Sequence, residues 1–326
     1  MSLHPIIARA LAAGARLAPY HALPIEEARA TAQKAYRRLD EPVPVGRVQN
    51  LTWPSSESDI KVRVYTPQTP GPHAGMVFFH GSGFVMLNLD THDDICRRLC
   101  KQSNRVVVSV DYRLAPEHPF PAAPNDCLAA TLKVLELADS LGISNEGLAL
   151  VGDSAGACLA AVTAWRMKHS HEHSDSDSDS HSHEHEFAHI HVNAIKSLLL
   201  FYPVTDAPNP ARPSYQLYGE GHGLSVTGMQ WFWKQYMGSF SESSHPHATP
   251  LHANPLEGMP PTYIVTAGHD VLRDEGEDYF KRLLQAGTEA TYQCCENLNH
   301  GFLKYAGQID EVDHVIHQAC QWLQQR

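Results

Sequence analysis

The chain has 326 residues, enough to bury a large core, and α/β folds of this size are often one domain with a smaller appendage. Its 36 acidic and 25 basic residues give a formal net charge of −11, and no cluster of basic side chains occurs. This balance argues against a nucleic-acid partner, because such proteins depend on Lys and Arg contacts to phosphates.

The cysteines and the N-terminus indicate the compartment. The seven cysteines contain no Cys-x-x-Cys, so neither a disulfide framework nor a zinc ribbon is predicted, and reduced thiols are expected. The first residues lack the pattern of a signal peptide, and no run approaches the roughly 20 apolar residues that span a bilayer. We therefore expect a soluble, cytoplasmic protein with no membrane partner.

The first part of the chain predicts helices followed by exposed strands. Residues 1 to about 40 have apolar positions at helical spacing, and Pro19 and Pro24 separate two helices. Residues 48–53 and 60–65 then alternate apolar and polar side chains, which is typical of antiparallel strands at a sheet edge.

Beyond residue 75 the pattern changes to apolar runs separated by helix-length segments. The runs are residues 76–79, 106–110, 148–151, 195–201 and 263–266, with a last strand at 291–295. Segments such as 93–102 and 127–141 predict helices between them. Apolar strands alternating with helices predict an α/β fold with a mostly parallel central sheet flanked by helices.

Two segments interrupt this alternation. Residues 205–240 contain a Pro-rich turn region and then an aromatic helix at 229–237. Its side chains are expected to pack against neighbouring helices, to line an apolar substrate pocket in part, or to do both. Residues 169–191 are rich in His, Ser and Asp and low in complexity, so a solvated surface insertion is expected. Its imidazoles and carboxylates could also chelate zinc, copper or nickel.

The main candidate for chemistry is Ser154. Residues 152–156 are Gly-Asp-Ser-Ala-Gly and lie between an apolar strand and a helical run at 157–165. A Gly-x-Ser-x-Gly in that context predicts a nucleophile elbow, the strained turn that holds a serine hydroxyl above the end of a sheet. The alternative for the pentapeptide alone is a glycine-rich loop that happens to contain serine.

The groups that an elbow serine requires follow other predicted strands. Residues 80–84, His-Gly-Ser-Gly-Phe, are a variant of the His-Gly-Gly-Gly oxyanion loop. Asp270 follows the strand at 263–266 and is the preferred acid, because Asp274 with Glu277 resembles the capping pair of a helix over 275–284. His300 follows the last strand, which completes the order Ser, Asp, His of this hydrolase fold.

These motifs, with 111–117 (Asp-Tyr-Arg-Leu-Ala-Pro-Glu), 270–276 (Asp-Val-Leu-Arg-Asp-Glu-Gly) and 300–302 (His-Gly-Phe), resemble those of bacterial carboxylesterases of the hormone-sensitive-lipase family, a branch of the α/β-hydrolases. The resemblance implies a triad of Ser154, Asp270 and His300, with oxyanion donors from the backbone of Ser82, Gly83 and Ala155. It implies hydrolysis of small, short-acyl esters without a metal or organic cofactor. It also implies a catalytic domain formed by 46–204 and 241–326, with a helical cap made of 1–45 and 205–240.

The sequence departs from the family at Ser82, where glycine is usual, and in the insertion at 169–191. Amide, lactone or carbamate hydrolysis would use the same triad and stays open. The other classes are a ligand receptor on this fold, which the intact triad argues against, and a metal-binding protein acting through the insertion. The expected partner is a small ester, and a homodimer is compatible with the sequence.

Overall fold

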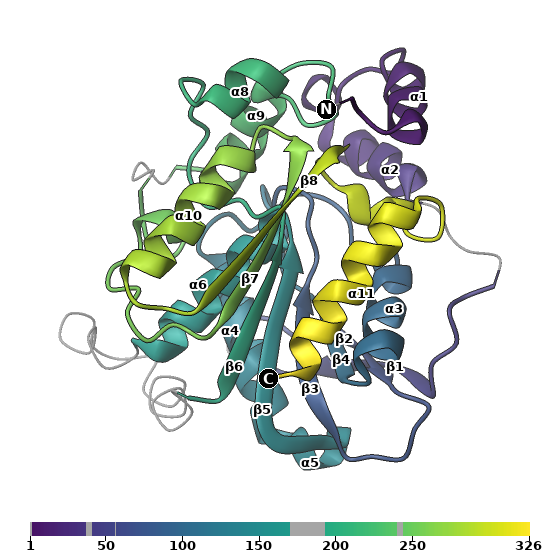
Figure 1. Ribbon diagram of the computed structural model, residues 1–326, viewed down its shortest axis with the longest axis vertical. Helices are drawn as coiled ribbons and strands as arrows, with labels where there is room; N and C mark the ends of the chain where they lie inside the picture. The colour runs from purple at the N-terminus through teal and green to yellow at the C-terminus, as the bar shows by residue number, and fades with distance from the viewer. Residues whose placement is uncertain (1, 37–40, 56, 170–192, 240–243) are drawn as a thin grey trace.

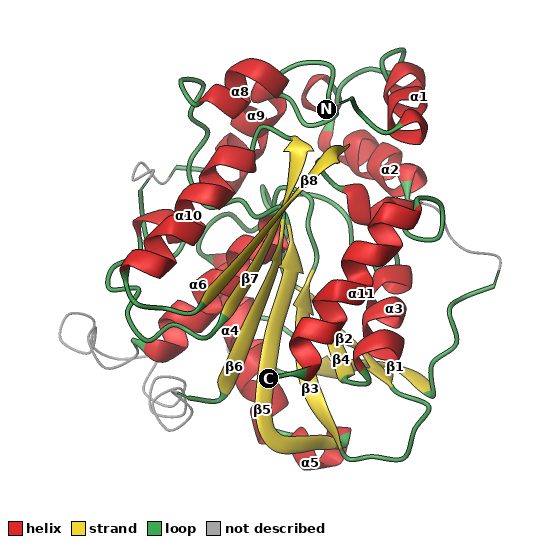
Figure 2. Cartoon of the chain, in the orientation of Figure 1, coloured by secondary structure: helices red, strands yellow, loops and turns green. Residues whose placement is uncertain are grey.

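A computed structural model describes residues 2–36, 41–55, 57–169, 193–239 and 244–326. Within these residues one sheet of eight strands has the order β1-β2-β4-β3-β5-β6-β7-β8 (Figure 2). The strands are β1 Arg47–Trp53, β2 Ile60–Thr66, β3 His73–Phe79, β4 Val106–Asp111, β5 Ile143–Asp153, β6 Ile195–Phe201, β7 Thr262–His269 and β8 Ala290–Asn299. The β1/β2 and β2/β4 pairs are antiparallel and the rest are parallel, so the predicted antiparallel edge and mostly parallel sheet are confirmed.

The central strands are apolar throughout because helices cover both faces of the sheet. In β3, Val77 and Phe79 belong to the apolar cluster that includes residues of α4, α6 and α10, whereas Met76 and Phe78 belong to the cluster that includes residues of α3 and α11. These helices are α3 Asp93–Ser103, α4 Ala122–Glu136, α6 Ala155–Lys168, α10 Arg273–Gln285 and α11 Asp310–Gln324. The helix predicted over 127–141 is divided at Leu137 into α4 and the short α5 (Ala138–Leu141).

Four further helices lie beyond the carboxyl ends of the strands, at the top of Figure 1: α1 Pro5–Gly14, α2 Ile25–Ala35, α8 Pro213–Tyr218 and α9 Val226–Met237. Three single turns of 3-10 helix complete the described elements: Tyr20–Ala22, Pro250–His252 and Phe302–Tyr305. Buried Ala28 and Ala32 of α2 pack in one apolar cluster with Phe232 of α9. Residues from the two segments predicted to form the cap, 1–45 and 205–240, therefore meet in one apolar cluster above the sheet.

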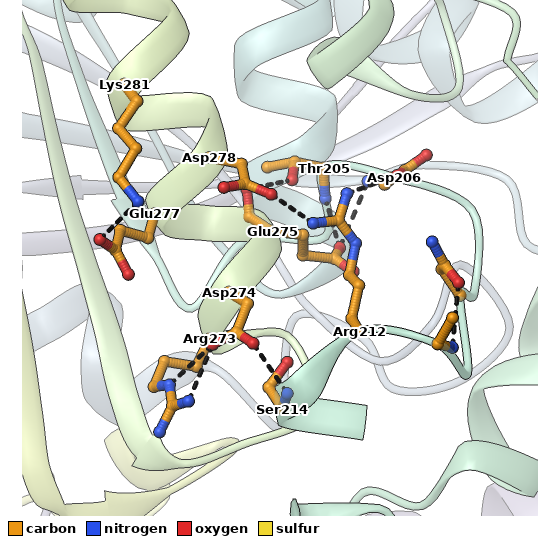
Figure 3. A network of polar contacts seen from close by, with 12 residues as sticks. Thr205, Asp206, Arg212, Ser214, Arg273, Asp274, Glu275, Glu277, Asp278 and Lys281 are labelled. Carbon is orange, nitrogen blue, oxygen red and sulfur yellow. Dashed lines mark hydrogen bonds and ion pairs between the residues drawn. The ribbon is translucent and has the colours of Figure 1, made fainter. Parts of the chain in front are cut away.

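A polar network attaches the start of α10 to the connection between β6 and α8 (Figure 3). The Glu275 side chain has no exposed surface, and its Oε1 accepts hydrogen bonds from the N–H groups of Thr205 at 2.9 Å and Asp206 at 3.3 Å. Arg212 forms ion pairs with Asp206 and Asp278. The network fixes the chain where it leaves the sheet to form α8.

All seven cysteines are free thiols, as the sequence predicts, and six of them are buried. Among the helices that the structure describes, none has both the length and the apolar character needed to cross a bilayer. Apart from His169, the predicted insertion at 169–191 lies outside the described residues.

Candidate active site

The predicted elbow is present between β5 and α6. Ser154 has φ 54° and ψ −120°, a backbone conformation that L-residues rarely adopt, and its side chain is close to fully buried. The turn requires glycine at position 156, because a Cβ there would lie 1.9 Å from the carbonyl oxygen of Phe79. The Ser154 N–H donates to the carbonyl of Phe201 at 2.9 Å, which ties the turn to the end of β6.

The pairing of β7 with β8 brings the predicted acid and histidine together. The register places His269 opposite Asn299, so the next residues, Asp270 and His300, leave the sheet side by side. Asp270 Oδ2 lies 2.8 Å from Nδ1 of His300, while Oδ1 accepts the N–H of Leu272 at 3.0 Å. Both carboxylate oxygens of this buried side chain are thus engaged.

His300 connects the acid to the serine. Its Nε2 lies 2.9 Å from Oγ of Ser154, and its ring contacts that of Tyr202 edge to face at a centroid distance of 4.9 Å. An ionised carboxylate only accepts hydrogen bonds, so Nδ1 carries the proton and Nε2 presents its lone pair to the serine hydroxyl. This arrangement can remove the proton of Ser154 as its oxygen attacks.

The loop predicted to bind the oxyanion follows β3, the neighbour of β5 in the sheet. Phe79 pairs with Gly152, so the loop at 80–84 and the elbow emerge at the same place. Ser82 has φ 104°, in the left-handed region that favours glycine. The serine that replaces the family's usual glycine therefore has a glycine-like backbone conformation despite its Cβ. Gly83 leaves room for the ring of Phe232, which would lie 2.2 Å from a Cβ at that position.

The aromatic helix predicted at 229–237 is α9, and it covers this loop. The ring of Tyr236 stacks on that of Phe84 at a centroid distance of 3.7 Å, and Phe232 contacts Gly83. The packing interpretation of the aromatic run is therefore confirmed for these two residues. The substrate-pocket interpretation stays a prediction.

The interpretation of Asp274 as a helix cap was wrong. Helix α10 begins at Arg273, two residues before the predicted start, and no side chain caps it. Asp274 instead accepts the N–H of Ser214 at 2.8 Å, in the first turn of α8, and pairs with Arg273 (Figure 3). The Asp274 carboxylate thus connects α8 to α10. Of the two aspartates, it is Asp270 that contacts His300.

Two buried polar residues next to the loop at 80–84 are not predicted from the sequence. There Asp153 is only the variable position of the elbow motif, and His92 precedes α3 without any motif around it. A carboxylate directly after the fully buried run 148–152 was an available signal, because such a charge needs partners. For His92 the single sequence contains no signal. Among the described residues no cluster of three potential metal ligands occurs.

The sheet order, the turn at Ser154 and the loops after β7 and β8 are together those of an α/β hydrolase. The chain belongs to the alpha/beta hydrolase fold family, whose sequence profile matches residues 76–304. It is 31% identical to an ethyl acetate hydrolase of Pseudomonas putida over 338 aligned positions, which cover 100% of this chain and 99% of that protein.

Solved structures agree. An alpha/beta hydrolase enzyme from the metagenome of Lake Arreo, Spain, crystallised as a serine-to-alanine mutant, superposes with a TM-score of 0.87 at 31% identity, covering 99% of this chain and 98% of that one. A hyperthermophilic esterase from the archaeon Pyrobaculum calidifontis has a TM-score of 0.84 at 32% identity, with 100% and 99% covered. The resemblance to the hormone-sensitive-lipase family is thereby confirmed.

Proposed function

We propose that the protein is a serine carboxylesterase that hydrolyses small, short-acyl esters through an acyl-enzyme on Ser154. The observation that carries this proposal is the continuous contact from Ser154 Oγ to His300 Nε2 at 2.9 Å and from His300 Nδ1 to Asp270 at 2.8 Å. The relative from Pseudomonas putida is named for a small ester, which supports the same substrate class.

The reaction has two halves. In acylation, His300 accepts the proton of Ser154 as Oγ attacks the ester carbonyl, and it then donates that proton to the leaving alcohol. The N–H groups of Ser82, Gly83 and Ala155 are proposed to stabilise the oxyanion of the tetrahedral intermediate. In deacylation, His300 takes a proton from water, which attacks the acyl-enzyme, and returns it to Ser154.

The helices above the strand ends are the proposed cap. Helices α1, α2, α8 and α9 lie beyond the carboxyl ends of the strands, where ligands bind in open parallel sheets (Figure 1). Because Phe232 of α9 rests on Gly83, the cap limits the space next to the proposed oxyanion site. We therefore expect the rate to fall as the acyl chain lengthens.

The free thiols support a reducing compartment. Disulfides persist in oxidising environments, and all seven cysteines of this chain are unpaired, including the adjacent Cys294 and Cys295. We propose a cytoplasmic location on this ground.

A series of p-nitrophenyl esters from acetate to decanoate, with a p-nitroanilide and a lactone alongside, tests the proposal. We expect the highest kcat/KM on short esters and little amide or lactone cleavage. Ser154→Ala should lower kcat by on the order of a million-fold. Ser197→Ala, which removes another buried hydroxyl in β6, is the matched control and should keep full activity. A Ser154→Ala variant that retains a tenth of wild-type activity would place the nucleophile elsewhere.

A further inference from the structure

A buried carboxylate lies directly beneath the oxyanion loop. Asp153 is 3% exposed, and its Oδ1 accepts the N–H of Gly81 at 2.8 Å. Its Oδ2 accepts the hydroxyl of Tyr202 at 3.3 Å, and the ring of Tyr202 packs against His300. The Asp153 side chain thus contacts both the loop, through Gly81, and Tyr202, whose ring packs against His300.

The second partner of Asp153 is His92, at the N-terminus of α3. Nε2 of His92 lies 3.3 Å from Asp153 Oδ1, and both side chains are buried. Since an ionised carboxylate has no hydrogen to donate, this contact is attractive only if Nε2 carries a proton.

The far side of the His92 ring contacts Thr91. Its Nδ1 lies 3.0 Å from Oγ1 of Thr91. The single hydroxyl proton of Thr91 is donated to the carbonyl of Asn88 at 2.7 Å, while Oγ1 accepts the N–H of Asn88 at 3.1 Å. Thr91, itself bonded to Asn88, therefore holds the ring with Nε2 facing Asp153.

The pKa values of the Asp153 carboxyl and the nearby His80 ring are both shifted at this site. Burial by itself would raise the pKa of the Asp153 carboxyl, but the interaction with His92 and the hydrogen bond from Gly81 hold it below its usual value. Burial and then the interaction with His92 lower the pKa of His80 to about 3, so His80 is neutral. Its ring lies 5.4 Å from that of His92.

We propose that Asp153, held in place by His92, positions the oxyanion loop for catalysis. The bond from Gly81 N–H to Asp153 fixes the peptide just before the one that carries the Ser82 N–H. Oxyanion donors act only within a few tenths of an ångström of their required place, so this anchor sets their effectiveness. Asp153 and His92 are positioning residues, and the proposal rests on the esterase function above.

The first test separates transition-state binding from substrate binding. His92→Gln and Asp153→Asn are compared with wild type after titration of active sites with a phosphonate, so that only folded, reactive molecules count. We expect kcat to fall about 10- to 100-fold with KM changed less than threefold, because a displaced donor weakens only the tetrahedral state. The affinity for an acyl trifluoromethyl ketone, which forms an oxyanion on the serine, should fall by the same factor.

The double variant and a control separate positioning from stability. Because the pair acts as a unit, the His92→Gln/Asp153→Asn variant should lose less than the product of the single losses. Arg105→Met removes a buried charge that donates to the carbonyl of Leu323 at 2.6 Å, at the opposite end of β4. It should lower Tm and leave kcat and KM unchanged.

A second measurement does not depend on the catalytic activity of any variant. Nitrogen-15 NMR of the wild-type protein should show a protonated Nε2 on one histidine, and this signal should disappear in His92→Gln. A His92 ring without a proton on Nε2 overturns its contact with Asp153. A normal kcat and ketone affinity per titrated site in both single variants overturns the positioning role. If wild type cleaves no ester, the proposed function fails, and the NMR result still decides whether His92 contacts Asp153.

Discussion

Asp270→Asn tests the assignment of the acid, because the structure shows which hydrogen bonds the amide cannot keep. The carboxylate accepts from Leu272 N–H at 3.0 Å through Oδ1 and from His300 Nδ1 at 2.8 Å through Oδ2. An asparagine has one accepting oxygen and one donating NH₂ group. If its oxygen stays on Leu272, the NH₂ faces Nδ1, and His300 must hold its proton on Nε2, where it can no longer accept the proton of Ser154.

The alternative rotamer is also unfavourable. Turning the amide so that its oxygen faces His300 would place the NH₂ against the Leu272 N–H in a buried site, and an unsatisfied buried donor costs about 1–3 kcal/mol. The inactive tautomer is therefore favoured, and we expect kcat to fall by about 10⁴, or roughly 5.4 kcal/mol in the activation barrier. KM should change little, since the orienting acid does not contact the substrate.

Asp274→Asn is the matched control four residues along the chain. Its amide oxygen can still accept the N–H of Ser214, so kcat should stay within about twofold, with a loss of unfolding free energy near 1 kcal/mol. Both variants are measured by initial rates on p-nitrophenyl acetate and by urea denaturation. A kcat above a tenth of wild type for Asp270→Asn, or a larger loss for Asp274→Asn, refutes the assignment.

Two further predictions concern stability and the insertion. Burial raises the pKa of Glu275 well above its ordinary value, so the folded state holds the proton more tightly, and this stabilisation is lost as pH rises above about 4.5 and through the folded pKa. The free energy of unfolding, measured by urea denaturation from pH 5 to 9, should decline less for Glu275→Gln than for wild type or for the control Glu277→Gln. Equal declines with pH in the three proteins contradict this prediction. Deleting residues 170–185 should leave kcat/KM unchanged, because α6 carries the chain about 20 Å from Ser154. The deletion should also remove the affinity for nickel resin, because it removes the histidines of the insertion. A tenfold loss of kcat/KM in a folded deletion variant contradicts it.

The sequence by itself determined the elements and the order of the motifs. Apolar runs such as 76–79 predict strands buried on both faces, because side chains on both sides of such a strand are apolar and avoid water. Residues 152–156 predict the strained turn because only small residues fit there, as at Gly156. Ser154, Asp270 and His300 could be selected because each follows a predicted strand. The motifs and their positions after predicted strands therefore identify these three residues without any interatomic distance.

Only the tertiary structure decided which groups meet. The β7/β8 register brings Asp270 and His300 together, and α8 takes Asp274 for another purpose. Asp153 and His92 are separated by 60 residues of chain, and their contact exists only because β3 and β5 are neighbours and α3 returns beneath the loop. A buried charge finds its partner through packing of distant segments, and sequence spacing contains no trace of that pairing.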